Sequence, residues 1–92
     1  MELIFRGKFS REYFKIKNKE CLKFSSDIFK QIEKANSITE IGGLKKLREY
    51  GHYYRIKIKI SEKNDYRMVL MIRGNKVWAE RIGLAKNIFY KQ

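Results

Sequence analysis

The feature that most constrains the fold is the stretch from Tyr53 to Arg73, where apolar residues recur at every second position. In YYRIKIKI, cationic residues mostly separate the apolar ones, which are Tyr54, Ile56, Ile58 and Ile60. A period of two is typical of a strand with one buried face. The segment YRMVLMIR repeats the pattern, and the polar SEKND between the two segments predicts a hairpin loop longer than two residues. The stretch therefore predicts an antiparallel hairpin with one face in the core and one basic face.

Two further segments have strand patterns. Glu2 to Arg6 is a short apolar run that ends at Gly7. KVWAERI, from Lys76 to Ile82, follows the turn signal Gly74-Asn75 and predicts a third consecutive antiparallel strand, although its apolar residues do not alternate cleanly. The segment after Gly83 predicts a short C-terminal helix of one or two turns.

Apolar residues at helical spacing predict two helices between the first strand and the hairpin. Ser10 is the predicted N-cap of the first helix, which ends near Asn18. From Lys19 to Ala35, apolar residues recur at steps of three and four and predict the main helix. Ser37 and Glu40 have the spacing of a capping box, which predicts one further helical turn. The order of elements predicts an α+β fold: an N-terminal strand, two helices packed on an antiparallel sheet that three consecutive C-terminal strands complete, and a short C-terminal helix.

The charge of the chain is strongly positive, with a net value of +12. Residues 45–92 carry 13 Lys and Arg against four Asp and Glu, so most of the excess belongs to the half that contains the hairpin. Such an excess favours a partner that bears phosphates or acidic side chains. The alternative is an ordinary lysine-rich surface.

Several classes of protein are disfavoured by the sequence. Cys21 is the only cysteine and falls in the helical pattern, which excludes an internal disulfide and favours a reducing compartment. No apolar run approaches the roughly 20 residues of a membrane span, and the N-terminus lacks a signal-peptide pattern. With His52 the only histidine and no paired carboxylates at ligand spacing, we expect no metal and no cofactor. The expectation is one cytoplasmic domain spanning residues 1–92.

The remaining chemistry is that of a metal-free cationic site. Cleavage of RNA through its own 2′-hydroxyl needs a base for that proton, cations for the charge that builds on phosphorus, and an acid for the leaving oxygen. Lys57 is the candidate for proton transfer, and the cations around it are Arg55, Lys59 and Arg67. Tyr53 and Tyr90 are candidates for stacking unpaired bases. A solvated strand with ordinary lysines is an equally good interpretation of composition alone.

The chain resembles the RelE/ParE toxin superfamily of bacterial and archaeal toxin-antitoxin pairs. The resemblance covers nearly the whole chain and rests on EKANSITEIGGLKKL, on YYRIKIKI, on the YR pair Tyr66-Arg67 and on KVWAERIG. It implies a RelE-like fold and, for the RelE-like branch, metal-independent cleavage of mRNA on the ribosome that a cognate antitoxin neutralises. By position, Arg55 and Lys57 match the basic strand residues of that branch, and Arg67 matches its phosphate-stabilising arginine.

The C-terminus departs from the family pattern, in which a basic pair is followed four residues later by a tyrosine. Here the arginine position is Ala85 and the tyrosine position is Phe89, with Lys86 and Tyr90 one residue later. Arg81 and Lys86 are therefore further candidates for binding phosphate. The departure leaves three interpretations open. The first is a weakened mRNA endonuclease, whose partners are an antitoxin, the ribosome and mRNA. The others are a ParE-like toxin that binds DNA gyrase and a non-toxic basic RNA-binding module.

Overall fold

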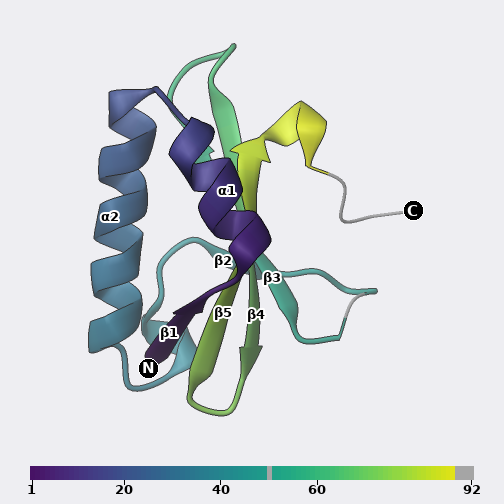
Figure 1. Cartoon of the computed structure of the whole chain (residues 1–92). Helices are drawn as coiled ribbons and strands as arrows, with labels where there is room; N and C mark the ends of the chain where they lie inside the picture. Colours follow the sequence, from purple (N-terminus) through teal and green to yellow (C-terminus); the bar gives the residue numbers. More distant parts are fainter. Residues whose placement is uncertain (50, 89–92) are drawn as a thin grey trace.

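A computed structural model describes residues 1–49 and 51–88 as a five-stranded sheet with two α-helices packed against it (Figure 1). The elements in chain order are β1 (Glu2–Phe5), α1 (Gly7–Lys15), α2 (Lys19–Lys34), η1 (Ile38–Glu40), β2 (Leu44–Lys46), β3 (Tyr53–Lys59), β4 (Asp65–Arg73), β5 (Lys76–Leu84) and η2 (Ala85–Asn87). The predicted α+β class and the RelE-like order of elements are confirmed. In the described part of the chain, no helix has the length and apolarity needed to cross a membrane.

The sheet is mixed and has the order β1-β5-β4-β3-β2. The predicted hairpin and the third consecutive strand are antiparallel, whereas β1 pairs with β5 in parallel, so the expectation of a purely antiparallel sheet is wrong. Because β3 and β5 are both antiparallel to β4, they run in the same direction, and β1 shares that direction. Strand β2, antiparallel to β3, was not predicted because its three residues, LKK, are too few to show a period.

A bulge in β5 explains the irregular pattern of KVWAERI. Val69 of β4 lies opposite Arg81 and Leu70 lies opposite Ala79, so Glu80 is the extra residue. One inserted residue changes the phase of the alternation. Ala79 before the bulge and Ile82 after it therefore both face the core, with exposed fractions of 0% and 1%.

The helix boundaries correct two predictions. Helix α1 begins at Gly7, and the Ser10 amide already donates to the Arg6 carbonyl inside the helix, so Ser10 is not its N-cap. The chain turns into the helix directly after β1, and this places Phe9 in the core. The turn η1 is present as a 3₁₀ turn, but Glu40 accepts from the Asn36 amide and Ser37 bonds to Thr39, so the expected capping box is not formed.

The hydrophobic core lies on one face of the sheet, beneath the helices. Its fully buried residues come from both layers and include Phe9, Cys21, Ile32, Ile58 and Met68. Burial raises the pKa of the Cys21 thiol, which keeps it protonated and unreactive, in agreement with its interpretation as core. Neither of the two α-helices covers the opposite face of the sheet (Figure 1).

Replacing Leu70 by alanine is expected to lower the free energy of unfolding by about 2–5 kcal/mol, because Leu70 is fully buried in the central strand β4. Phe14→Ala is the matched control, since the Phe14 side chain is 85% exposed and its loss is expected to change stability by less than about 0.5 kcal/mol. Urea unfolding of both variants measures the difference. Equal losses would show that the core does not extend as described.

Candidate functional site

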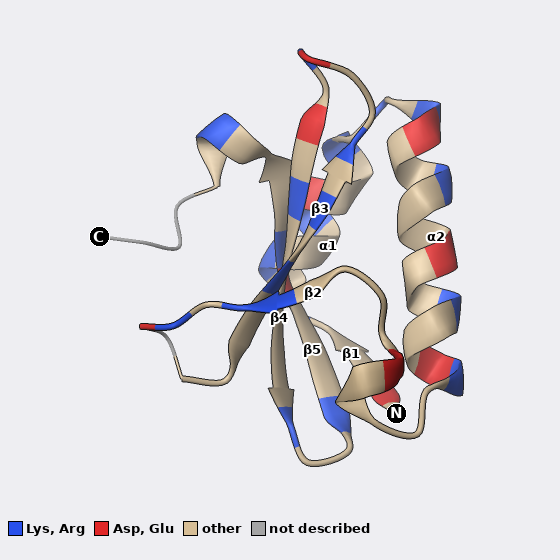
Figure 2. Ribbon diagram, turned by 180° about the vertical axis from the view of Figure 1, so that it is seen from behind, with Lys and Arg blue, Asp and Glu red and all other residues tan. Residues whose placement is uncertain are grey.

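Most of the cations that belong to the sheet lie on the side away from the helical layer, which we call the open face. Figure 2 views it with α1 behind the strands, and Lys and Arg occur along β2, β3 and β4. By strand alternation and register, the cations of the open face are Lys45, Arg55, Lys57, Lys59, Arg67, Arg73, Lys76 and Arg81. The basic face expected from the sequence is therefore present, and it extends over four strands.

The centre of the open face pairs cations directly across neighbouring strands. Lys57 of β3 lies opposite Arg67 of β4, and Lys45 of β2 lies opposite Arg55 of β3. Side chains in such cross-strand pairs are about 5 Å apart at Cβ, and like charges in this position destabilise a sheet. These cation pairs therefore lower the stability of the sheet, and they favour the binding of an anion between the strands.

Arg67 is held in place by its own strand. Its Nη1 donates to Oδ1 of Asp65, which precedes it by two residues and so lies on the same face. The Arg67 side chain is only 16% exposed, and its Nε is buried without a hydrogen-bond partner. The ion pair thus orients the guanidinium but leaves its Nε donor without a hydrogen-bond acceptor. A signal for Asp65 existed in the sequence, because residues i and i+2 of a strand share a face.

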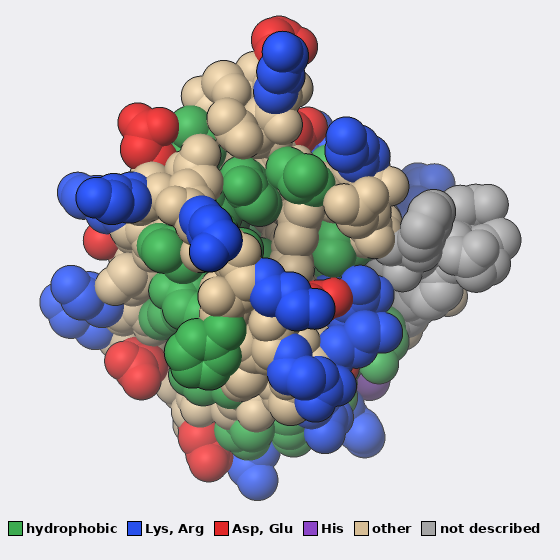
Figure 3. Space-filling model, turned by 45° about the horizontal axis from the view of Figure 1, so that its top comes forward, with side chains coloured by type: hydrophobic (Ala, Val, Ile, Leu, Met, Phe, Trp, Pro, Cys, Tyr) green, Lys and Arg blue, Asp and Glu red, His purple; other side chains and the backbone are tan. Residues whose placement is uncertain are grey.

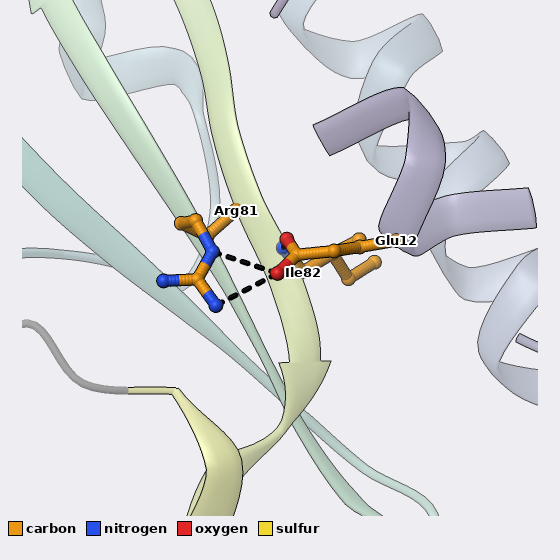
Figure 4. Close-up of polar contacts among 3 residues, drawn as sticks. All are labelled: Glu12, Arg81 and Ile82. Atoms are coloured by element: carbon orange, nitrogen blue, oxygen red, sulfur yellow. Dashed lines mark hydrogen bonds and ion pairs between the residues drawn. The ribbon is translucent and has the colours of Figure 1, made fainter. Parts of the chain in front are cut away.

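Arg81 is held by Glu12 of α1 (Figure 4). The Arg81 Nε and Nη2 atoms lie 2.8 and 2.7 Å from Glu12 Oε2, while the Ile82 amide donates to Glu12 Oε1 over 3.0 Å. Strand β1 ends opposite Ala79, so beyond that point the edge of β5 has no strand partner and α1 runs beside it. One carboxylate therefore protects a free strand edge and fixes a cation of the open face.

The start of the C-terminal segment packs against the open face beside Arg67. Gly83 lies opposite Arg67, and a Cβ at Gly83 would lie 3.2 Å from Cδ1 of Ile88. Ile88 and Val69 are 6% and 4% exposed but lie outside the main core cluster. The glycine permits this close approach, and the packing brings η2, with the exposed Lys86, next to β4.

A hollow surrounds the free edge of β5 between the end of α1, the β3–β4 loop and η2. It is lined by Lys15, Asn64, Tyr66, Arg81, Gly83 and Ile88, among others. Burial raises the pKa of the Tyr66 phenol, so at neutral pH this group is able to donate a hydrogen bond but not to act as a base. Arg81 is therefore both a cation of the open face and part of the lining of this hollow.

Besides Lys86, which lies on η2, the predicted site residues divide into three groups. Arg55, Lys57, Lys59 and Arg67 are neighbours at the centre of the open face, and Arg81 lies at its edge. Tyr53 is exposed on the same face but is four residues from Lys57 along β3, so it does not adjoin the proton-transfer candidate. Tyr90 and Phe89 lie outside the described residues. Glu12, which the sequence analysis missed, gave no signal because it is 69 residues from Arg81.

The helical side of the molecule differs in character from the open face. Three phenylalanines on β1, α1 and α2 are well exposed: Phe5 at 47%, Phe14 at 85% and Phe24 at 44%. Figure 3, which tips the top of the molecule forward, shows hydrophobic side chains at the surface in its centre and Lys and Arg gathered to their right. These three side chains are available for contact with another protein.

Comparison with known proteins shows structural relatives. A chain of the RelB-RelE antitoxin-toxin complex from Methanococcus jannaschii has a TM-score of 0.75 at 20% identity, over 90% of this chain and 91% of that chain. A chain of the intact E. coli RelBE complex has a TM-score of 0.67 at 22% identity, over 91% and 95%. The isolated E. coli RelE toxin has a TM-score of 0.65 at 21% identity, over 91% and 83%. No protein-family model and no curated protein sequence matches.

These likenesses establish the fold. The chain has the architecture found in RelE toxins along nearly its whole length, as the sequence resemblance implied. Among residues 1–49 and 51–88, no group of three metal-ligating side chains lies together. The charged groups of the open face are lysines, arginines and carboxylates.

Proposed function

We propose that this protein is the toxin of a type II toxin-antitoxin system and acts in the cytoplasm as a ribosome-dependent, metal-independent mRNA endonuclease. The observation that carries the proposal is the cross-strand pair of Lys57 and Arg67 at the centre of a basic face, on a fold found in RelE toxins. A face of this charge suits a phosphate backbone. An oriented, partly desolvated guanidinium suits a phosphate that gains charge during a reaction.

In the proposed reaction the 2′-oxygen of a nucleotide attacks the adjacent phosphorus, and the bond to the 5′-oxygen of the next nucleotide breaks. Lys57, exposed at the centre of the face, accepts the proton of the 2′-hydroxyl, and water supplies a proton to the departing 5′-oxygen, so the products are a 2′,3′-cyclic phosphate and a free 5′-hydroxyl. Arg67 and Arg55 stabilise the negative charge on the non-bridging oxygens. Lys59 and Arg81 bind the flanking phosphates, and Lys86 extends the basic surface on η2.

The proposed protein partner is a cognate antitoxin. Two structural relatives are chains of antitoxin-toxin complexes, from Methanococcus jannaschii and from E. coli. This chain offers exposed phenylalanines on its helical side and a net charge of +12. Both features suit an acidic, amphipathic segment that folds when it binds.

Expression of the protein in growing bacteria is expected to arrest growth and to create new 5′ ends inside translated mRNA. Primer extension on a reporter transcript maps those ends, and the same transcript without its start codon is the control, because cleavage on the ribosome requires translation. Growth arrest with intact transcripts would contradict the nuclease function. Inhibition of DNA supercoiling by purified gyrase would then identify the ParE-like alternative.

A further inference from the structure

A row of large apolar side chains crosses the open face next to its cationic centre. Tyr53 of β3 lies opposite Met71 of β4, Met71 lies opposite Trp78 of β5, and Trp78 lies opposite Ile4 of β1. Residues that pair across strands share a face, so the four form one line, which we call the aromatic row. None of them belongs to the hydrophobic core cluster, and Tyr53 is 36% exposed.

Cations flank the aromatic row on both sides. On one side of the row, Arg55 is two residues from Tyr53 along β3. On the other side, Arg73 is two residues from Met71 and Lys76 is two residues from Trp78, and these two cations pair with each other across the strands. Positions i and i+2 of a strand are about 6.6 Å apart. The row is thus an uncharged strip with Arg55 on one side, where Val69 separates it from Arg81, and with Arg73 and Lys76 on the other, where Lys76 also lies opposite Glu2 of β1. A planar apolar group with a phosphate on either side matches this pattern, and an unpaired nucleotide in a single strand has that form.

Trp78 is the largest planar group of the row, and an exposed cation, Arg6, lies over its ring. Arg6 Cζ lies 5.7 Å from the centre of the Trp78 ring, near the outer limit of about 6 Å for a cation–π contact. Arg6 is also paired with Glu80 at 3.0 Å, with side-chain exposures of 48% and 20%. Ion pairs as exposed as this one contribute little stability. A base that approaches Trp78 can therefore displace the guanidinium, which then has a phosphate to bind.

We propose that the aromatic row binds an unpaired RNA base, with Trp78 as the main stacking surface, while the adjacent phosphate lies on Arg55 and the next phosphate along the strand lies on Lys57 and Arg67. This subsite rests on the proposed function, since it places the same RNA strand on the same face. It also assigns a role to Trp78 and Met71, which the phosphate-binding cations do not require. Stacking tolerates any base, so the subsite contributes affinity for single strands without a strong preference for sequence.

Trp78 is the only tryptophan, so its fluorescence reports on this subsite directly. Titration of the purified protein with a short single-stranded RNA is expected to quench this fluorescence. In parallel, the anisotropy of labelled RNA is expected to show binding about tenfold weaker for Trp78→Ala, with an unchanged salt slope because no phosphate contact is lost. Trp78→Phe should retain most of the affinity. Leu22→Ala, which shortens a partly exposed apolar side chain on α2, should bind like the wild type.

Two further measurements keep the inference open to refutation. If Trp78→Ala does not fold, Trp78→Leu keeps an apolar side chain without a ring face and is expected to show the same loss. An RNA backbone that lacks bases is expected to bind the wild type as weakly as intact RNA binds the alanine variant, and without quenching.

Salt-dependent RNA binding with unchanged fluorescence and unchanged affinity of the variants would overturn the stacking subsite, while the proposed endonuclease would stand. Quenching by anionic lipid vesicles but not by RNA would overturn the subsite as well, and mapping of transcript ends would test the endonuclease separately.

Discussion

Arg67→Ala is expected to slow mRNA cleavage about a hundredfold, because removal of one preorganised charge that stabilises a transition state typically costs 10²–10³ in rate. Arg67 lies opposite Lys57 and is oriented by Asp65, so its guanidinium is the best-ordered cation at the centre of the open face. Its low exposure lets it act with little screening by water. The measurement is the single-turnover cleavage rate of mRNA bound to ribosomes, compared with the wild type.

The matched control for Arg67→Ala is Lys30→Ala on α2, which removes the same charge from an exposed position on the helical side. It is expected to change the cleavage rate by less than about twofold, because an exposed charge at a distance is screened by salt. Thermal unfolding of both variants separates loss of activity from loss of fold. Equal slowing of the two variants would mean that only bulk positive charge matters, and that the cross-strand pair has no special role.

The fold was predictable from the sequence where short-range patterns determine it. The period of two from Tyr53 to Arg73 reports one buried face of a hairpin, and the steps of three and four after Lys19 report one buried face of a helix. The parallel pairing of β1 with β5 has no such signal, because it joins residues about 74 positions apart, as for Glu2 and Lys76. The bulge at Glu80 shows in the sequence only as the broken alternation of KVWAERI, because its position depends on the pairing with β4.

The cations of the open face were predictable from the sequence, whereas Glu12, which holds Arg81, was not. Arg55, Lys57 and Arg67 were identified because alternation places them on one face and the family resemblance gives that face a use. The Glu12 contact to Arg81 forms only because α1 runs beside the free edge of β5, which is a property of the assembled fold. Strand alternation and charge therefore located the surface, and tertiary packing decided which cations are oriented on it.

Ala85→Arg is expected to raise the rate of mRNA cleavage, by up to about a hundredfold if the new guanidinium stabilises the transition state. The family resemblance places an arginine at this position, and the structure gives it a physical context. Leu84 pairs with Tyr66, so Ala85 begins η2 next to Asp65, and η2 contacts β4. Ala85 is partly exposed, so a long side chain has access to solvent and to the neighbouring Arg67.

Ala85→Gln is the matched control, because it adds a long polar side chain without a charge. The arginine variant is expected to cleave faster than both the wild type and the glutamine variant in the ribosome assay, with the gain reduced by Arg67→Ala because both guanidinium groups act on the same phosphate. Asp65 would form an ion pair with the new arginine in the absence of RNA, so the gain should appear in the cleavage step more than in RNA affinity. A rate equal to that of the glutamine variant would show that the open face does not use a cation from the C-terminal segment, and that the cations of β3 to β5 carry the reaction alone.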